Sequence, residues 1–246
     1  MRLDGKRAIV TGGASGFGAG IVRKFAAEGA KVMVADLNLD LAEEIASEVN
    51  GLAIKADVSS NDSVSHLADV ASSLLGSVDI LVNNAGITHL PKPMQDVTED
   101  EFDRVMAVNC KSVYLTAKHF VPAMTKAGKG AILNVASTAG LSPRPKLNWY
   151  NASKGWMITA TKTMAVELAP SGVRVNAICP VAGETPLLKS FMGEDTPEMR
   201  AKFLSTIPIG RFSTPEDMGN AACFLCSDEA GMITGVAMEV DGGRCI

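Results

Sequence analysis

Residues 7–18 have the sequence RAIVTGGASGFG, a short apolar run that leads directly into a cluster of glycines. The first five residues predict a buried strand, and the spacing of Ile21, Val22 and Phe25 predicts a helix that follows the glycines and ends near Gly29. A glycine turn between a strand and a helix lets a pyrophosphate approach the backbone, and the start of the helix offers free N–H groups. We therefore expect a dinucleotide-binding loop; a plain tight turn is the alternative.

Beyond this unit, apolar strands alternate with helical segments at regular spacing. Strands are predicted at 31–35, 52–56, 78–82, 131–136, 174–178 and 236–240, and helices at 38–49, from the caps at 59–61 to about 75, and at 99–124, 150–169 and 215–225. This alternation predicts an α/β fold: a single doubly wound Rossmann-type domain, residues 1–246, with a central parallel sheet of about seven strands and helices on both faces.

Composition narrows the classes of protein. With 246 residues, 47% of them hydrophobic, the chain is long enough for one large core. The net charge of -4 with mixed signs gives no basic stripe for nucleic acid, and no apolar stretch is long enough for a membrane span or a signal peptide. Scattered cysteines fit reduced thiols in a cytoplasmic enzyme, and Cys223 and Cys226 fit buried helix positions better than a metal or redox pair. Because carboxylates do not occur at metal-ligand spacing, we expect no catalytic metal.

Asp36 follows the second predicted strand, about twenty residues beyond the glycine cluster. A carboxylate at this position can accept hydrogen bonds from an adenosine ribose diol and would repel a 2'-phosphate. Neither Ala14, Ser15 nor Leu37 supplies a cation that favours NADP. The sequence therefore predicts NAD as the cofactor. A surface role for Asp36 as the cap of the helix 38–49 stays open.

Polar residues also follow or interrupt later elements. Asn83-Asn84-Ala85-Gly86 follows the strand 78–82, at the edge where open α/β sheets bind ligands. Asn109 lies within an apolar helical stretch and needs hydrogen-bond partners there, as a site residue or as a satisfied core amide. The strand 131–136 delivers Ser137 at its carboxyl end.

Tyr150 and Lys154 are separated by one helical turn if Tyr150 opens a helix. A phenol is a poor general base at neutral pH, because its ordinary pKa is about 10. An ammonium group one turn away favours the phenolate and lowers that pKa, so this pair can make a usable proton-transfer group. The alternative is an amphipathic helix whose exposed face happens to carry Tyr and Lys.

Taken together, the Thr11-Gly12-x-x-x-Gly16-x-Gly18 turn, Asn83-Asn84-Ala85-Gly86, Ser137 and Tyr150-x-x-x-Lys154 resemble the short-chain dehydrogenase/reductase family over nearly the whole chain. The resemblance implies nicotinamide-dependent hydride transfer between an alcohol and a carbonyl. It implies that Tyr150 is the general acid/base, that Lys154 lowers its pKa and holds the nicotinamide ribose, that Ser137 orients the substrate oxygen, and that Asn109 joins a water-linked proton relay. Together with the glycine turn and Asp36, the resemblance implies a cofactor-binding set that comprises Gly12, Ser15, Gly16, Phe17, Gly18, Asp36, Leu37, Asp57, Val58, Asn84, Ala85, Gly86, Tyr150, Lys154, Pro180, Val181 and Thr185.

After the strand 174–178 the sequence departs from the family's commoner Pro-Gly pattern, because Val181 follows Pro180 and the glycine is displaced to Gly183. Thr185 can still reach a nicotinamide amide. Residues 183–212 are rich in Met, Leu, Phe and Pro, and a long insertion beside the crevice predicts a substrate lid. Small helices packed permanently on the core are the alternative.

We expect an NAD-dependent dehydrogenase that acts on a secondary alcohol, sugar or polyol, or a carbonyl reductase. A 3-oxoacyl-[acyl-carrier-protein] reductase shares the catalytic residues but normally uses NADPH, so Asp36 argues against it. A nucleotide-binding regulatory protein without catalysis is the alternative from another class. Arg144 and Lys146 can attract an anionic substrate or simply be solvated. By the same resemblance we expect a homotetramer.

Overall fold

The computed structural model describes residues 1–246, and its centre is a parallel sheet of seven strands. The strands are β1 (Arg7–Thr11), β2 (Lys31–Asp36), β3 (Leu52–Lys55), β4 (Ile80–Asn83), β5 (Gly130–Val135), β6 (Val173–Pro180) and β7 (Ala237–Val240). Their order across the sheet is β3-β2-β1-β4-β5-β6-β7, and every neighbouring pair is parallel. The direction of winding reverses between β1 and β4, and this reversal leaves a crevice at the carboxyl ends of the strands.

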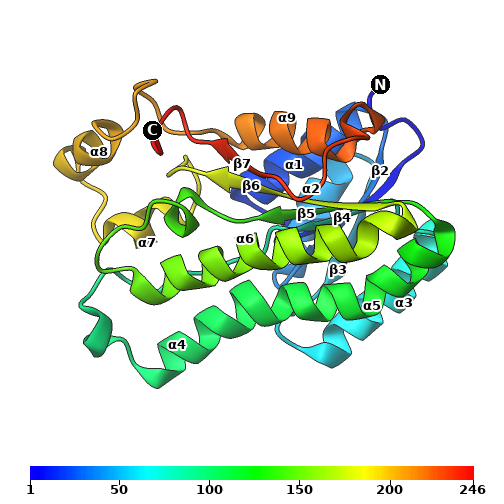
Figure 1. The fold of residues 1–246 in the computed structure, drawn as a ribbon, viewed down its shortest axis with the longest axis horizontal. Coiled ribbons are helices and arrows are strands. Elements are labelled where there is room, and N and C mark those ends of the chain that lie inside the picture. Colours follow the sequence, from blue (N-terminus) through cyan, green and yellow to red (C-terminus); the bar gives the residue numbers. More distant parts are fainter.

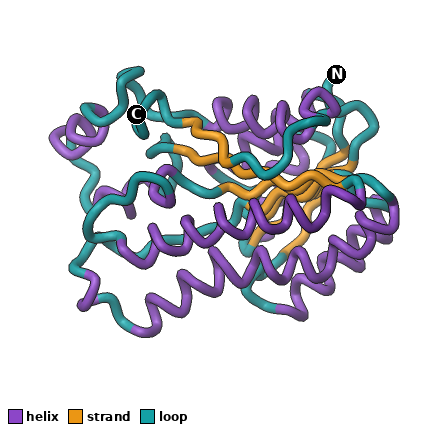
Figure 2. Tube along the Cα trace, viewed as in Figure 1, coloured by secondary structure: helices purple, strands orange, loops and turns teal.

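Helices cover both faces of the sheet, which lies as a central layer between them (Figures 1 and 2). The helices are α1 (Gly16–Ala27), α2 (Leu39–Glu48), α3 (Asn61–Leu75), α4 (Glu99–Met106), α5 (Ser112–Ala127), α6 (Asn148–Leu168), α7 (Leu188–Met192), α8 (Pro197–Leu204) and α9 (Pro215–Cys226). Figure 1 shows α1, α2 and α9 on one face, and α3, α5 and α6 on the other. The short helices α7 and α8 lie beyond the end of the sheet. None of the helices combines the length and the apolar character that crossing a bilayer requires.

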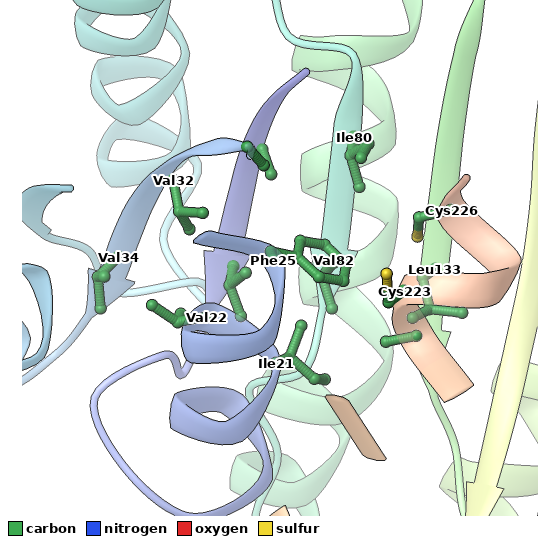
Figure 3. Packing of buried hydrophobic residues seen from close by; sticks show 14 of the residues in the cluster. Ile21, Val22, Phe25, Val32, Val34, Ile80, Val82, Leu133, Cys223 and Cys226 are labelled. Carbon is green, nitrogen blue, oxygen red and sulfur yellow. The ribbon is translucent and has the colours of Figure 1, made fainter. Parts of the chain in front are cut away.

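The core follows from the alternation of side chains along the strands. On β1, Ala8 and Val10 pack into the cluster under α1, α2 and α9, whereas Ile9 packs into the cluster under α3, α5 and α6. Figure 3 shows the first cluster, in which α1 presents Phe25 to the sheet and α9 presents Cys223. All five cysteines are free, and four of them, including the pair on α9, are buried. The predicted α/β fold with a parallel, helix-covered sheet is confirmed.

Three predicted boundaries are wrong. The helix predicted at 99–124 is interrupted by one turn of π-helix, Ala107–Lys111, between α4 and α5. The strand predicted at 78–82 begins two residues later, at Ile80, and the carboxylate of Asp79 just before it pairs with Arg7, with Arg7 Nε 2.8 Å from Asp79 Oδ2. Tyr150 does not open its helix, since α6 begins at Asn148.

The layer above the sheet depends on a glycine contact between α1 and α9. A Cβ built at Gly20 would lie 2.2 Å from the carbonyl oxygen of Pro215, and a Cβ at Gly219 would lie 2.8 Å from the carbonyl oxygen of Gly20. Both contacts involve backbone atoms, which cannot turn aside as a flexible side chain can. The two helices therefore approach so closely that their contact excludes any side chain at these positions.

We expect Gly20→Ala to lower the free energy of unfolding by about 1–3 kcal/mol, because the added methyl forces the two helix backbones apart. Chemical denaturation followed by circular dichroism measures the change. Gly155→Ala is the matched control, since this glycine is also helical and the nearest atom to its built Cβ is 3.8 Å away. That variant should be unchanged or more stable by up to about 1 kcal/mol. Equal stabilities for the two variants would contradict the contact.

Candidate functional site

A cavity of about 540 Å³ opens at the carboxyl ends of the strands. Ser137, Tyr150 and Lys154 line it, whereas Asn109 is fully buried and is not part of its lining. The structure brings the residues that sequence analysis assigned to the cofactor into the same wall: Gly12, Ser15, Gly16, Phe17, Gly18, Asp36, Leu37, Asp57, Val58, Asn84, Ala85, Gly86, Tyr150, Lys154, Pro180, Val181 and Thr185.

The glycine turn at one end of this cavity is shaped by close backbone contacts. Gly12 has a φ of +61°, and a Cβ at Gly18 would lie 2.1 Å from the Gly12 carbonyl oxygen. Asn84 Nδ2 donates hydrogen bonds to the carbonyl oxygens of Thr11 (2.9 Å) and Gly12 (2.8 Å). Ser15 precedes α1 without a capping hydrogen bond from its side chain, so the first N–H groups of the helix have no side-chain partner. Such groups, with the positive end of the helix dipole, suit a phosphate.

Asp36 ends β2 beside the glycine turn. Its carboxylate accepts hydrogen bonds from the backbone N–H groups of Ala14 (3.1 Å) and Asn38 (3.0 Å). The cap of α2 is Asn38, whose side chain accepts a hydrogen bond from the N–H of Leu41, so Asp36 is free of that role. The lining residues beyond the ends of β2 and β3 include no cation: Leu37, Ala56, Asp57 and Val58. The carboxylate of Asp36 therefore lies at this end of the cavity without a neighbouring cation.

Ser137, Tyr150 and Lys154 meet near the end of β5. Ser137 lies two residues beyond Val135, the last residue of that strand, and its Oγ accepts a hydrogen bond from the N–H of Ala139 (3.0 Å). Lys154 Nζ donates to the carbonyl oxygen of Val135 at 2.8 Å and lies 5.9 Å from the centroid of the Tyr150 ring. Tyr150 and Lys154 are each only 4% exposed. They are therefore not part of an exposed amphipathic face.

Burial shifts both titrating groups. It raises the pKa of Tyr150 to about 12, with Ser137 acting in the opposite direction, and it lowers the pKa of Lys154 to about 8. We expected Lys154 to lower the pKa of the phenol, whereas the pKa of Tyr150 in the structure is raised. The reason is that burial desolvates the phenolate, and this effect is larger than that of the hydrogen bond with Ser137, which favours the phenolate.

Asn109 lies in the π-helical turn and holds two segments together. Its Oδ1 accepts from the N–H of Ile87 (2.9 Å), and its Nδ2 donates to the carbonyl oxygen of Ile87 (2.9 Å) and to Ser153 Oγ (2.9 Å). A Cβ at Gly86 would lie 3.3 Å from Lys154 Nζ and 3.5 Å from Asn109 Oδ1, so these two polar groups flank the same glycine. The amide is thus satisfied by protein partners and also lies close to the buried amine.

Several lining residues were not assigned to the site from the sequence. They include Leu147, Phe191 and Phe203, and the ring of Phe191 lies edge-on to Tyr150 with 5.1 Å between centroids. Arg144 is half-buried and lines the cavity, whereas Lys146 is exposed and does not. Hydrophobic positions on the short helices carried no signal of which of them face the cavity.

A cavity between a glycine turn at a helix start and a group of Ser137, Tyr150 and Lys154 is typical of a nucleotide-dependent oxidoreductase. A family model described as enoyl-(acyl carrier protein) reductase matches residues 12–244. A 4-formylbenzenesulfonate dehydrogenase of Comamonas testosteroni is 51% identical, with 100% of both chains covered. The chain belongs to the short-chain dehydrogenase/reductase family. It is therefore an NAD(P)-dependent oxidoreductase that acts on hydroxyl or carbonyl groups.

Solved structures agree with this assignment. The crystal structure of a 3-ketoacyl-(acyl-carrier-protein) reductase from Brucella melitensis complexed with NADH has a TM-score of 0.95 and 49% identity, covering 99% of this chain and 100% of that one. A short-chain type dehydrogenase/reductase from Mycobacterium marinum has a TM-score of 0.91 and 34% identity, covering 98% and 96%. The chain is similar to both over its whole fold.

The raised pKa of Tyr150 can be measured directly, because the chain has only two tyrosines. In Tyr114→Phe, Tyr150 is the sole source of phenolate absorbance, and we expect almost none at pH 10, where a free tyrosine with a pKa of about 10 is half-ionised. Ultraviolet difference spectra of the folded protein give the titration. The reciprocal variant Tyr150→Phe leaves Tyr114, which is 57% exposed, as the reference. A midpoint for Tyr150 below that of free tyrosine would contradict the desolvation argument.

Proposed function

We propose that this protein is an NAD-dependent oxidoreductase that transfers a hydride between a secondary alcohol, including a sugar or polyol hydroxyl, and the corresponding carbonyl. The observation that carries the proposal is the convergence of Ser137, Tyr150 and Lys154 on a cavity whose other end has a glycine turn and Asp36. A bound nicotinamide supplies the hydride chemistry, and the protein supplies binding, orientation and proton transfer.

The residues of the cavity fit NAD. The unpartnered N–H groups at the start of α1 suit its pyrophosphate, and Asp36 suits the hydroxyls of its adenosine ribose. The support for NAD over NADP is that a carboxylate stands at this end of the cavity without a neighbouring cation. A relative that is 49% identical was crystallised with NADH, which agrees with this choice.

Tyr150 handles the proton. With a pKa of about 12, Tyr150 is a protonated, uncharged phenol at every physiological pH. It can donate its proton to a carbonyl oxygen during reduction. In the oxidative direction Tyr150 must first lose its own proton, because only the phenolate can accept the proton of the alcohol. The ammonium group of Lys154, held 5.9 Å from the centroid of the ring, favours that phenolate electrostatically. Ser137 orients the substrate oxygen, and Asn109 holds the loop at Ile87 against α6 and so positions Lys154.

Residues 183–212 serve in this proposal as a substrate lid. The segment carries α7 and α8, and its buried residues Leu188, Met192, Ile207 and Phe212 form a small cluster of their own with Val181. That cluster is separate from the two large clusters on the faces of the sheet. A lid with its own core can move as a unit while the sheet stays fixed.

Two relatives bear on the substrate. The Comamonas testosteroni relative is named for an aromatic aldehyde that carries a sulfonate, and we therefore extend the proposed carbonyl class to aldehydes. The Brucella melitensis relative is named as a 3-ketoacyl-(acyl-carrier-protein) reductase, which makes a 3-oxoacyl-[acyl-carrier-protein] substrate the second candidate. Asp36 alone does not separate these candidates, because that relative was crystallised with NADH.

We also propose that residues 1–246 form one domain and that the protein is a cytoplasmic homotetramer. The free cysteines support a reducing compartment. Large apolar side chains are exposed on two long helices of the same face, Tyr114 on α5 and Trp156 and Val166 on α6, and such residues suit an interface between subunits (Figure 1).

Tyr150→Phe should lower kcat by about 10²–10⁴-fold while NADH binding stays within a few fold, because the variant loses the proton donor and keeps the cavity. Turnover of the carbonyl compound that the wild type reduces fastest, and titration of NADH fluorescence, measure the two effects. Tyr114→Phe, which removes an exposed hydroxyl, should keep full activity. Intact turnover in Tyr150→Phe would refute the proposed role. A wild type that binds NADH and reduces nothing would favour the non-catalytic alternative.

Asp36→Asn should raise the ratio of kcat/KM with NADP to kcat/KM with NAD by about tenfold or more, since the variant removes the charge that repels a 2'-phosphate. Steady-state kinetics with both cofactors give the ratio. The matched control is Asp40→Asn, which makes the same charge change at an exposed position outside the cavity and should leave the ratio unchanged. A wild type that already prefers NADP would contradict the assignment.

A further inference from the structure

Arg144 is a cation without a counter-ion in the wall of the cavity. It lies on the loop between Ser137 and Tyr150, is half-buried, and takes part in none of the salt bridges of the chain. Its Nη2 donates to Thr206 Oγ1 at 3.0 Å, and its Cζ lies 4.4 Å from the centroid of the Phe203 ring. The partners of this guanidinium are thus a hydroxyl and an aromatic face, neither of which neutralises its charge.

A second guanidinium without a salt-bridge partner, that of Arg244, lies close enough to Arg144 to act on its charge. Arg244 Nη1 donates to Ser142 Oγ at 3.0 Å, Ser142 itself lines the cavity, and the Nε of Arg244 is buried without a hydrogen-bond partner. Arg244 also forms no salt bridge. Burial and the positive charge of Arg244 both lower the pKa of Arg144, which shows that the two cations oppose each other. Two like charges held partly out of water are unfavourable unless an anion joins them.

Apolar and aromatic side chains line the cavity beside these polar groups. Leu147, Phe191 and Phe203 line it together with Tyr150, and the Phe191 ring packs edge-on against the Tyr150 ring. Flat apolar walls suit a ring or another planar apolar group. The cavity of about 540 Å³ must also admit the cofactor, because the glycine turn and Asp36 line its other end, so the space left for the substrate suits a compact molecule.

We propose that Arg144, supported by Arg244, is the anion-binding end of the substrate site, and that the substrate is a compact, planar apolar aldehyde or alcohol that carries a carboxylate or sulfonate. Arg144 is a specificity-determining residue in this proposal, which rests on the function proposed above. In the reductive direction the carbonyl carbon accepts a hydride from the reduced cofactor and the carbonyl oxygen accepts the proton of Tyr150. The products are the alcohol, with its anion unchanged, the oxidised cofactor and the phenolate of Tyr150, which then takes up a proton from water.

The competing role for Arg144 is structural: its contacts with Phe203 and Thr206 hold the loop against the region of α8, and we call this role a latch. The two roles differ in what they demand of the substrate. A latch acts equally on every substrate that enters under the lid. An anion-binding arginine acts only on substrates that carry the anion.

The experiment compares 4-carboxybenzaldehyde with its neutral methyl ester, methyl 4-formylbenzoate, as substrates of the wild type and of Arg144→Gln with NADH. For the anionic aldehyde we expect kcat/KM to fall by about 10–100-fold, mainly through KM, because a charge-assisted hydrogen bond is lost. For the methyl ester we expect a change of less than about threefold. Calorimetric titration of 4-carboxybenzaldehyde into the protein–NADH mixture of an inactive Tyr150→Phe background gives its Kd without turnover.

Lys146→Gln is the matched control, since it removes the same charge from an exposed position of the same loop that does not line the cavity. It should leave both substrates unaffected. An equal loss for both aldehydes in Arg144→Gln would assign Arg144 to the latch, and no loss for either would also overturn the proposal. The anionic aldehyde could bind when Arg144 is present, fail to bind to Arg144→Gln, and still not be reduced by the wild type. This outcome would support the anion site and refute the proposed reaction. Absence of binding to the protein with Arg144 intact would overturn the anion site itself.

Discussion

The hydrogen bond from Lys154 Nζ to the carbonyl oxygen of Val135 fixes the relative positions of the residues at the centre of the site. It ties α6 to the last residue of β5, and Ser137 follows that residue by two positions. Because Tyr150 lies one turn before Lys154, the same bond holds the phenol beside the serine. Leaving a buried carbonyl without a hydrogen-bond donor destabilises the folded protein by about 1–3 kcal/mol, so the bond that arranges the site also stabilises the fold.

Burying the ammonium group of Lys154 lowers the stability of the fold, and the lowered pKa of this group reflects this. Burial lowers the pKa of Lys154 from its ordinary 10.5 to about 8, so the protonated amine opposes folding at neutral pH, and that opposition disappears as the pH rises from about 8 towards 10.5. The same apolar wall keeps Tyr150 neutral. The large clusters on both faces of the sheet offset this local instability. A site that needs an ammonium group and a phenol out of water therefore depends on the size of the core around it.

Local patterns in the sequence were sufficient for the elements and their order. The run from Arg7 to Gly18 predicted strand, turn and helix, and regular alternation predicted the parallel sheet. Contacts between distant segments could not be predicted from these local patterns. The π-helical turn at Asn109, for example, has its hydrogen-bond partners on the loop at Ile87 and on α6. The direction of the Tyr150 pKa shift was also wrong, because spacing along a helix gives the nearness of an amine and says nothing of how much water remains around the ring.

The surroundings of Arg144, which bear on substrate specificity, could also not be predicted from local sequence. Its neighbours along the chain, Pro143 and Pro145, are exposed, and nothing local distinguishes it from the exposed Lys146. Its burial comes from Phe203 and Thr206, and the charge beside it comes from Arg244 near the end of the chain. The glycine turn and Tyr150 stand on the sheet and on long helices, whereas the substrate end is assembled from loops and short helices. Substitutions there can change the substrate while the chemistry, fixed by β5 and α6, stays the same.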